Sequence, residues 1–180
     1  EIHHFAASEM AAALCAQPPI TPDHALRTKG PYLLVERPPY ANEEALAATL
    51  RAEVERYRHE YRQYFERNRS RAGAGIEMID PTPRVVVLPG LGVFATGQTR
   101  RAARVAADIA EHTIRAKIWA STIGLYAGIS DEELFDMEYW PPERAKLDAA
   151  TPPPMAGRVA LITGGAGAIA AANLRRGAEP

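Results

Sequence analysis

The sequence predicts an α/β fold in which a small sheet is covered by long helices, followed by the first strand, turn and helix of a Rossmann-type unit. Two amphipathic stretches, 42–68 and 99–124, have the period of long helices, and three short apolar or β-branched runs have the length of strands. A further strand-like run, 158–163, leads directly into glycines, as in nucleotide-binding α/β units. We therefore expect two units, residues 1–150 and 151–180.

Composition is that of a folded protein and excludes several classes. Hydrophobic residues make up 47% of the 180 residues and charged residues 24%, which argues against a disordered or fibrous chain. The formal net charge of -1 provides no basic field, so we expect no nucleic-acid partner. No apolar run approaches the roughly 20 residues of a membrane span, and the N-terminus lacks a signal-peptide pattern. We expect a cytoplasmic protein without a membrane partner.

The first 40 residues predict an alanine-rich helix, a loop and a strand. Residues 2–15 are rich in alanine and end before Pro18, which favours a helix over that stretch. The segment 21–24, Thr-Pro-Asp-His, is expected to be a loop, and the apolar run 32–35 has the pattern of a short strand. Cys15 is the single cysteine and cannot form an internal disulfide, which suits a reducing cytosol and predicts a buried structural thiol.

A long amphipathic helix should begin after Asn42, which is a good N-cap. Glu43 and Glu44 lie where the positive end of a helix dipole favours acids, and the helix should run to about Asn68. One face carries an apolar and aromatic stripe, namely Leu46, Leu50, Val54, Tyr57, Tyr61, Tyr64 and Phe65. Arginines between the aromatic residues could form a stacking surface for single-stranded nucleic acid. Abundant glutamate cancels that charge, so we expect the stripe to pack on a core.

A turn, two strands and a second long helix follow. Residues 71–75 predict a flexible turn, and 84–88 is a β-branched run short enough to be a buried strand. The glycine-punctuated segment 89–97 predicts a turn and another short strand. From about Thr99 an alanine-rich helix should extend to near Gly124. Its inner side should carry Ala103, Ala106, Ile109, Ala110, Thr113, Ile114, Lys117 and Ile118.

A capping box predicts a third, shorter helix. Ser130 and Glu133 have the spacing at which each side chain accepts a hydrogen bond from the other residue's backbone, so a helix should run to about Met137. Residues 138–142 should end it, with Tyr139-Trp140 as a packing anchor. The proline-rich run 151–154 has the composition of an interdomain linker.

The segment 157–169, Gly-Arg-Val-Ala-Leu-Ile-Thr-Gly-Gly-Ala-Gly-Ala-Ile, resembles the opening of the short-chain dehydrogenase/reductase family. The resemblance implies contacts to NAD or NADP from Thr163, Gly164, Gly165, Ala168 and Ile169. Ala168 and Ala170 stand at that family's second and third glycine positions, and a methyl group at Ala170 would crowd the helix against the strand or the cofactor. The family's catalytic Tyr-x-x-x-Lys segment would lie beyond Pro180, so we expect no dehydrogenase activity from this chain alone.

Four segments, 21–29, 84–94, 107–113 and 138–141, resemble the bifunctional rhamnulose-1-phosphate aldolase/alcohol dehydrogenase family. In that family an aldolase-type half precedes a short-chain dehydrogenase half. The resemblance implies a parent enzyme that cleaves a ketose 1-phosphate through zinc and then oxidises or reduces the aldehyde with NAD(P). The rest of that parent would be the partner of this chain.

The turn Gly90-Leu91-Gly92 predicts a degenerate aldolase-like unit. Class II aldolases have Asn-His-Gly in a similar layout, with the histidine as a zinc ligand, whereas leucine cannot bind zinc. The five histidines show no convergent triple, so we expect no metal site and no catalytic residue, with His24 the nearest to a ligand. Alternatively, Asp23-His24 with Arg27 and Lys29 could bind a sugar phosphate.

Two non-enzymatic alternatives remain open. In the first, the chain is an interaction or spacer module whose exposed helix faces dock neighbouring enzyme units or drive oligomerisation. In the second, the strand at Val159 swaps into another copy, because an unpaired strand edge invites a partner strand, and the chain forms a dimer. Saturable binding of NAD by the isolated chain would indicate a completed cofactor site, whereas no binding would favour one of these two alternatives.

Overall fold

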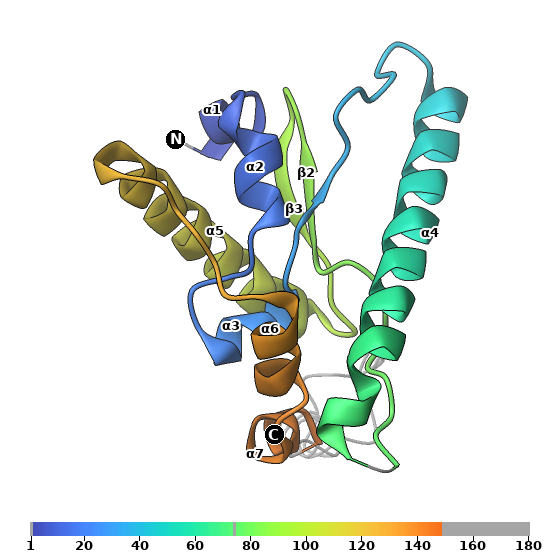
Figure 1. Cartoon of the computed structure of the whole chain (residues 1–180). Coiled ribbons are helices and arrows are strands. Elements are labelled where there is room, and N and C mark those ends of the chain that lie inside the picture. The colour runs from blue at the N-terminus through green and yellow to red at the C-terminus, as the bar shows by residue number, and fades with distance from the viewer. Residues whose placement is uncertain (1, 74, 149–180) are drawn as a thin grey trace, which may run out of the picture. The chain divides into compact units, whose positions relative to one another are not determined.

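Helices make up most of the chain that the computed structural model describes, which is residues 2–73 and 75–148. They are α1 (Ile2–Ala6), α2 (Met10–Ala16), α3 (Pro22–Thr28), α4 (Glu43–Asn68), the 3-10 helix η1 (Arg69–Ala72), α5 (Arg100–Ile123), α6 (Asp131–Glu138) and α7 (Pro141–Asp148) (Figure 1). The strands are β1 (Leu33–Leu34), β2 (Val85–Leu88) and β3 (Gly92–Ala95). Residues Glu1–Ala145 form one compact unit, and the description below concerns that unit.

The three strands form a mixed sheet of order β1-β2-β3. β1 runs parallel to β2, with Leu33 opposite Val86, and the amide of Val35 extends the pairing by donating to the carbonyl of Val87 at 3.1 Å. β2 and β3 form an antiparallel hairpin in which Leu88 lies opposite Gly92. The parallel pair requires a long connection, and α4 lies within it.

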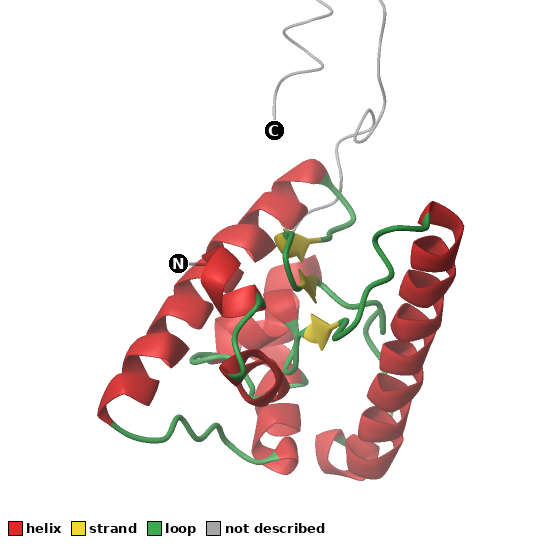
Figure 2. Ribbon diagram, turned by 90° about the horizontal axis from the view of Figure 1, so that it is seen from above, coloured by secondary structure: helices red, strands yellow, loops and turns green. Residues whose placement is uncertain are grey.

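Successive residues of β2 face opposite layers, because side chains alternate along a strand. Val85 and Val87 pack with residues of α1, α2 and α5 in one core cluster. Val86 and Leu88 pack with Tyr57 of α4 in another. In Figure 2 the strands lie between α4 on one side and α1, α2 and α5 on the other. The sheet is therefore the middle of three layers.

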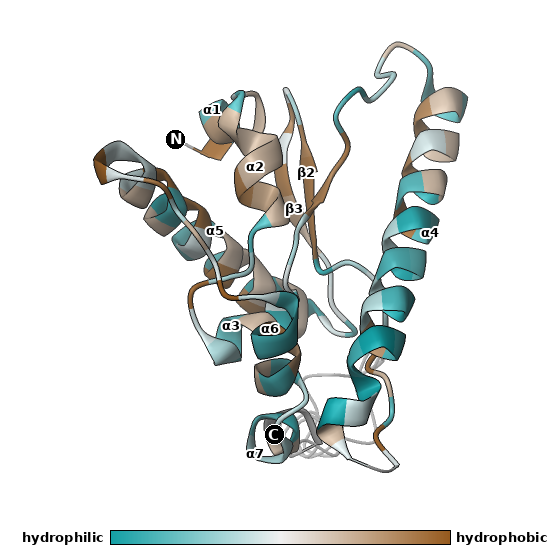
Figure 3. Cartoon of the chain, in the orientation of Figure 1, coloured by the Kyte–Doolittle hydropathy of each residue, from teal (hydrophilic) through white to brown (hydrophobic). Residues whose placement is uncertain are grey.

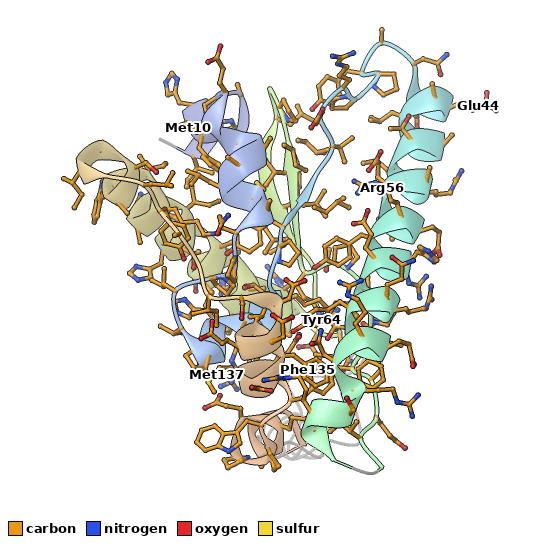
Figure 4. The ribbon with its side chains drawn as sticks, in the orientation of Figure 1. Met10, Glu44, Arg56, Tyr64, Phe135 and Met137 are labelled. Atoms are coloured by element: carbon orange, nitrogen blue, oxygen red, sulfur yellow. The ribbon has the colours of Figure 1, made fainter. Side chains whose placement is uncertain are left out.

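A third cluster fills the space where α3, α4 and α6 meet. Its buried members are Ala25, Tyr61, Tyr64, Phe65, Leu134, Phe135 and Tyr139. Phe135 stacks on Tyr139 with 4.3 Å between ring centroids and meets Tyr64 edge to face at 5.6 Å. Figure 4 shows Tyr64 and Phe135 between α4 and α6. This aromatic cluster surrounds the buried polar groups of the candidate site.

Most of the expected elements are confirmed. α4 begins after Asn42, whose side chain accepts a hydrogen bond from the amide of Ala45, and ends at Asn68. The hairpin strands and α5 lie where their patterns predicted them, and the capping box of Ser130 and Glu133 is complete. The α/β class and the small covered sheet are therefore as expected.

The N-terminal stretch folds as two helices, so the prediction of one helix over 2–15 is wrong. The chain turns at residues 7–9, where the hydroxyl of Ser8 donates to the carbonyl of Phe5 at 2.8 Å. Serine competes in this way with the hydrogen bonds that would continue a helix. The alanine content of residues 2–15, on which the prediction of one helix rested, gives no sign of this break.

Two prolines begin helices that were not expected. Pro22 opens α3, and the hydroxyl of Thr21 accepts a hydrogen bond from the amide of His24 at 3.2 Å. Pro141 opens α7, where only the end of α6 was expected. Proline suits a first helical turn because its missing N–H would have no intrahelical partner there. The loop predicted for 21–24 is therefore an N-cap and first turn.

The region 71–75 was expected to be a flexible turn. Its first residues belong to η1, and Gly73 then adopts a φ of 84°, which favours glycine. No helix among residues 2–73 and 75–148 is long and apolar enough to cross a membrane. The predicted linker 151–154, the strand 158–163 and the glycine turn after it lie outside the described residues.

Candidate functional site

Lys29, which follows α3, and Glu138, which ends α6, lie near one another across the third core cluster. They come from two segments singled out in the sequence, 21–29 and 138–141, and α3 packs against α6. Tyr61 and Tyr64 of α4 face them. Lys29, Tyr61, Tyr64, Glu138 and Tyr139 are called the Lys29–Glu138 cluster below.

Lys29 is buried without a hydrogen-bond acceptor for its amine. Its side chain is 2% exposed, and Nζ lies 3.8 Å from the centroid of the Tyr61 ring. No hydrogen bond or ion pair joins Nζ to another residue of the described chain. Lys29 is also the one non-glycine residue in that part of the chain with positive φ, at 65°, a conformation that costs free energy and recurs at functional sites.

Glu138 is fully buried, and only one of its two carboxyl oxygens has a hydrogen-bond partner among the described residues. Its Oε1 accepts a hydrogen bond of 2.9 Å from the hydroxyl of Tyr61, which also lies 2.8 Å from the hydroxyl of Tyr139. Neither Glu138 Oε2 nor the hydroxyl of Tyr64 has a hydrogen-bond partner among the described residues. The Tyr64 hydroxyl is nevertheless near enough to the Glu138 carboxyl to lower its pKa. Buried polar atoms are rarely left unpaired, so this cluster is a functional candidate.

Burial shifts both ionisable groups toward their neutral forms. Desolvation lowers the pKa of Lys29 to about 8, against the opposing attraction of the Glu138 carboxylate. Burial likewise raises the pKa of Glu138, and the positive charge of Lys29 opposes that shift. A lysine and a carboxyl group whose pKa values move toward neutrality can exchange protons with a bound molecule.

A cavity of about 190 Å³ adjoins the cluster between α4 and α6. Tyr61, Tyr64, Leu134 and Glu138 contribute to its wall, together with Gly30, the residue after Lys29. A Cβ atom on Gly30 would lie 2.5 Å from a terminal methyl of Leu134, so the backbone there approaches α6 more closely than a larger residue would allow. This close approach brings the chain directly after Lys29 to the cavity wall, and the Tyr61 ring that Lys29 contacts also lines the cavity.

The Asp23–Lys29 segment does not form the sugar-phosphate site considered from sequence. Arg27 pairs with Asp23 at 3.6 Å, His24 turns to α5, and Lys29 turns to Tyr61. The ring of His24 meets that of His112 edge to face at 5.8 Å, and its Nδ1 lies 3.3 Å from the hydroxyl of Thr113. Burial and, next, the neighbouring His112 lower the pKa of His24. The four side chains therefore do not converge on one ligand.

Within the described part of the chain, no three histidine, cysteine, aspartate or glutamate side chains come together as metal ligands. The turn compared with the aldolase zinc loop is the tip of the β2–β3 hairpin, where Gly90 and Gly92 have positive φ. Leu91 between them is half exposed to solvent. The ring of His3 lies against Gly92, so this histidine approaches the turn from α1.

Lys117 of α5 is a second buried lysine, with its amine fully engaged. Its Nζ donates to the carbonyls of Leu14 and Gln17 at 2.8 and 2.7 Å, at the end of α2. Desolvation lowers its pKa to about 8. Cys15 is buried beside it, as expected, and burial raises the pKa of the thiol to about 12. The two hydrogen bonds from Lys117 cap the C-terminal end of α2, so we assign Lys117 and Cys15 a structural role.

The packing anchor expected at Tyr139-Trp140 is half correct. Tyr139 is buried in the aromatic cluster, whereas half of Trp140 is exposed. The polar role of Tyr61 and Glu138 was not predicted, because the sequence pattern assigns Tyr61 to an apolar stripe and Glu138 to a helix end. A signal was present: Glu138 stands four residues after Leu134, on the buried face of α6.

Comparison with known proteins places the chain in a family. Residues 1–147 match the family described as aldolase class II, second domain. The chain belongs to this class II aldolase second-domain family. No solved structure matches the chain.

One relative of this second-domain protein is described as an uncharacterized oxidoreductase, YuxG, of Bacillus subtilis (strain 168). The two are 33% identical over 178 residues, which is 98% of this chain but 25% of the relative. The chain therefore spans a quarter of the relative's length. The predicted cofactor contacts at Thr163, Gly164, Gly165, Ala168 and Ile169 lie outside the described residues of the second-domain chain and stay a prediction.

Proposed function

We propose that this chain is the connecting module of a bifunctional enzyme. In the parent, a class II aldolase unit would cleave a ketose 1-phosphate, and a short-chain dehydrogenase unit would act on the aldehyde with NAD or NADP. The module would dock the two units and catalyse neither of those two reactions. The aligned quarter of the oxidoreductase-named relative carries this proposal, because it leaves room for further catalytic units in such a protein.

Exposed apolar side chains at the end of α5 support a docking role. Trp119 is 63% exposed, Ile123 91% and Leu125 92%. Figure 3 shows hydrophobic colour at this end of α5 and in the chain that follows it. Apolar side chains that gather on a surface commonly mark a contact with another protein unit. We assign this patch, Trp119, Ile123 and Leu125, to a neighbouring unit of the parent polypeptide.

Leu91 supports the assignment of zinc chemistry to another unit. It occupies the hairpin tip that corresponds to the zinc histidine in the layout of class II aldolases, and a leucine side chain has no atom that binds zinc. This chain would then be a second aldolase-like unit that keeps the fold as a scaffold. In the same parent, the turn from Thr163 to Ile169 would hold the cofactor pyrophosphate.

The experiment is to assay the full-length parent for ketose 1-phosphate cleavage and for NAD(P)-dependent aldehyde conversion, beside the isolated 180-residue chain. We expect both activities in the parent and neither in the chain. Ile123→Arg with Leu125→Arg should loosen the parent, seen as faster limited proteolysis between units, while the isolated chain melts as before. Activity of either kind in the isolated chain would refute the proposal.

A second candidate function is self-association through the same patch. Light scattering of the isolated chain separates the two functions. A dimer that the two arginine substitutions convert to monomer would favour oligomerisation, whereas a monomer before and after substitution would favour docking to another unit.

A further inference from the structure

We propose that Lys29 is a carbonyl-reactive amine whose Nζ condenses with small aldehydes that enter the cavity between α4 and α6, forming an imine. The reaction differs from both activities of the proposed parent and does not depend on them. It is carried by an amine that has no hydrogen-bond acceptor in the described part of the chain and lies over the ring of Tyr61, which lines the cavity together with the buried Glu138 carboxyl group.

Among the described residues, the amine of Lys29 has no hydrogen-bond acceptor, unlike the amine of Lys117. Lys29 and Lys117 are both buried, and desolvation lowers the pKa of each to about 8, so both have an appreciable neutral fraction near neutral pH. They differ in their hydrogen bonds. Lys117 Nζ donates to two carbonyls, whereas Lys29 Nζ rests on the face of the Tyr61 ring. An amine nucleophile is activated by desolvation in an apolar surrounding, and of these two lysines only Lys29 also lacks a described hydrogen-bond acceptor.

Glu138 supplies the proton transfers that the condensation needs. Nζ attacks the carbonyl carbon, the carbonyl oxygen takes a proton from the Glu138 carboxyl, and the carboxylate removes one proton from the nitrogen. The same carboxyl then protonates the hydroxyl, which leaves as water as the C=N bond forms. The remaining surplus proton returns from nitrogen to carboxylate, so one aldehyde and one amine give one imine and one water. Tyr61, bonded to Oε1, holds the carboxyl in place.

The cavity limits the size of the aldehyde. Its volume of about 190 Å³ is small for a ligand site, since pockets for drug-sized molecules start at about 300 Å³. Glu60 and Asp131 contribute to its lining, and Arg67 there is already paired with Asp131 at 3.5 Å. The surplus of acidic groups disfavours a phosphate. We therefore assign the site to uncharged hydroxyaldehydes of two or three carbons.

The test is reductive trapping on the purified 180-residue chain with glycolaldehyde and cyanoborohydride, followed by peptide mapping. The chain has three lysines, Lys29, Lys117 and Lys146. We expect Lys29 to be labelled at least about tenfold faster than Lys117. The rate should rise with pH as Lys29 loses its proton. Equal labelling of Lys29 and Lys117, or labelling of Lys146 alone, would overturn the proposal.

Two controls separate a built site from surface glycation. A polyethylene glycol that carries a terminal aldehyde is far too large for the cavity of about 190 Å³, so it should label Lys29 far less than glycolaldehyde does, relative to Lys146. Glu138→Gln should slow the trapping of Lys29 by about tenfold or more and flatten its pH profile, with circular dichroism confirming a retained fold. Lys29→Met, which keeps the apolar stem, should abolish the labelled peptide. An unchanged rate of Lys29 trapping in the folded Glu138→Gln chain would mean that Glu138 transfers no proton in this reaction.

Discussion

The hydroxyl of Tyr61 on α4 donates a hydrogen bond of 2.9 Å to Oε1 of Glu138, the last residue of α6. The same phenol ring lies beneath the amine of Lys29. One aromatic side chain thus contacts both the amine and the carboxyl group of a buried ionisable pair, and it joins α4 to α3 and α6.

Tyr61→Phe should destabilise the chain by about 1–3 kcal/mol, because it leaves the buried Glu138 carboxyl without its hydrogen-bond donor. The measurement is urea unfolding followed by circular dichroism. Tyr40→Phe is the matched control: the Tyr40 hydroxyl also donates one hydrogen bond, to the backbone carbonyl of Pro89, but in an exposed position. Its loss should stay within about 0.5 kcal/mol. Equal losses in both variants would mean that burial of Glu138 has no part in the effect.

Lys29→Met and Lys117→Met should have opposite effects. Lys117→Met leaves the carbonyls of Leu14 and Gln17 without their charged donor, so we expect a loss of about 2–4 kcal/mol. Lys29→Met removes a buried cation that has no described hydrogen-bond acceptor, and Glu138, whose pKa burial raises, can take up a proton once that cation is gone, so no unpaired charge stays buried and the chain should be at least as stable as before at neutral pH. Thermal melts of both variants under one buffer check the contrast. A large loss in Lys29→Met would show that its contact with Tyr61 outweighs the cost of desolvation.

The two buried lysines should make stability rise with pH between about pH 8 and 10.5. The folded-state pKa of Lys29 and Lys117 is about 8, below the ordinary 10.5, so the unfolded chain binds protons that the folded chain has released. From about pH 9 the thiol of Cys15 opposes this rise, since burial raises its pKa from 9.0 to about 12, and from about pH 10 the buried hydroxyls of Tyr32 and Tyr139 do the same. Lys29→Met should reduce the slope of unfolding free energy against pH, leaving the contribution of Lys117. An unchanged slope would contradict the lowered pKa of Lys29.

Gly30→Ala should cost about 1–3 kcal/mol, because the new methyl would lie 2.5 Å from Leu134 Cδ2. Leu134→Ala alone should cost about 2–5 kcal/mol through the cavity it leaves. The double variant removes the clash and should therefore lose less than the sum of the two. A double-mutant cycle by urea unfolding measures this coupling, which we expect at about 0.5–3 kcal/mol. Strict additivity would mean that the introduced methyl group does not lie against Leu134.

Local signals predicted the elements whose causes are local. The Asn42 cap with two following acids fixed the start of α4, and the capping box of Ser130 and Glu133 fixed that of α6. α3 and α7 were missed because their opening prolines were interpreted as breaks, although proline equally suits a first helical turn. The break between α1 and α2 depends on one serine hydroxyl, which composition does not show.

The candidate site could not be predicted because its members are distant in sequence. Lys29, Tyr61 and Glu138 meet only through tertiary packing of three helices, and each has an ordinary role in its own segment. The sugar-phosphate hypothesis grouped Lys29 with Asp23 and Arg27 because they are neighbours along the chain. Lys29 is instead the C-cap residue of α3, and its amine lies over the ring of Tyr61. The unexpected positive φ at Lys29 accompanies this C-cap position.

The parallel pairing of β1 with β2 has a consequence for the order in which the chain folds. Residues 35–84 separate the two strands, and closing so long a loop carries a large entropic cost and slows folding. α4 occupies 26 of those residues as one continuous helix, about 39 Å long, which can form early from local contacts. Once formed, it shortens the search that brings Leu33 to Val86. The hairpin of β2 and β3 is also local and can form early, so we expect the pairing of β1 with β2 to limit the rate of folding.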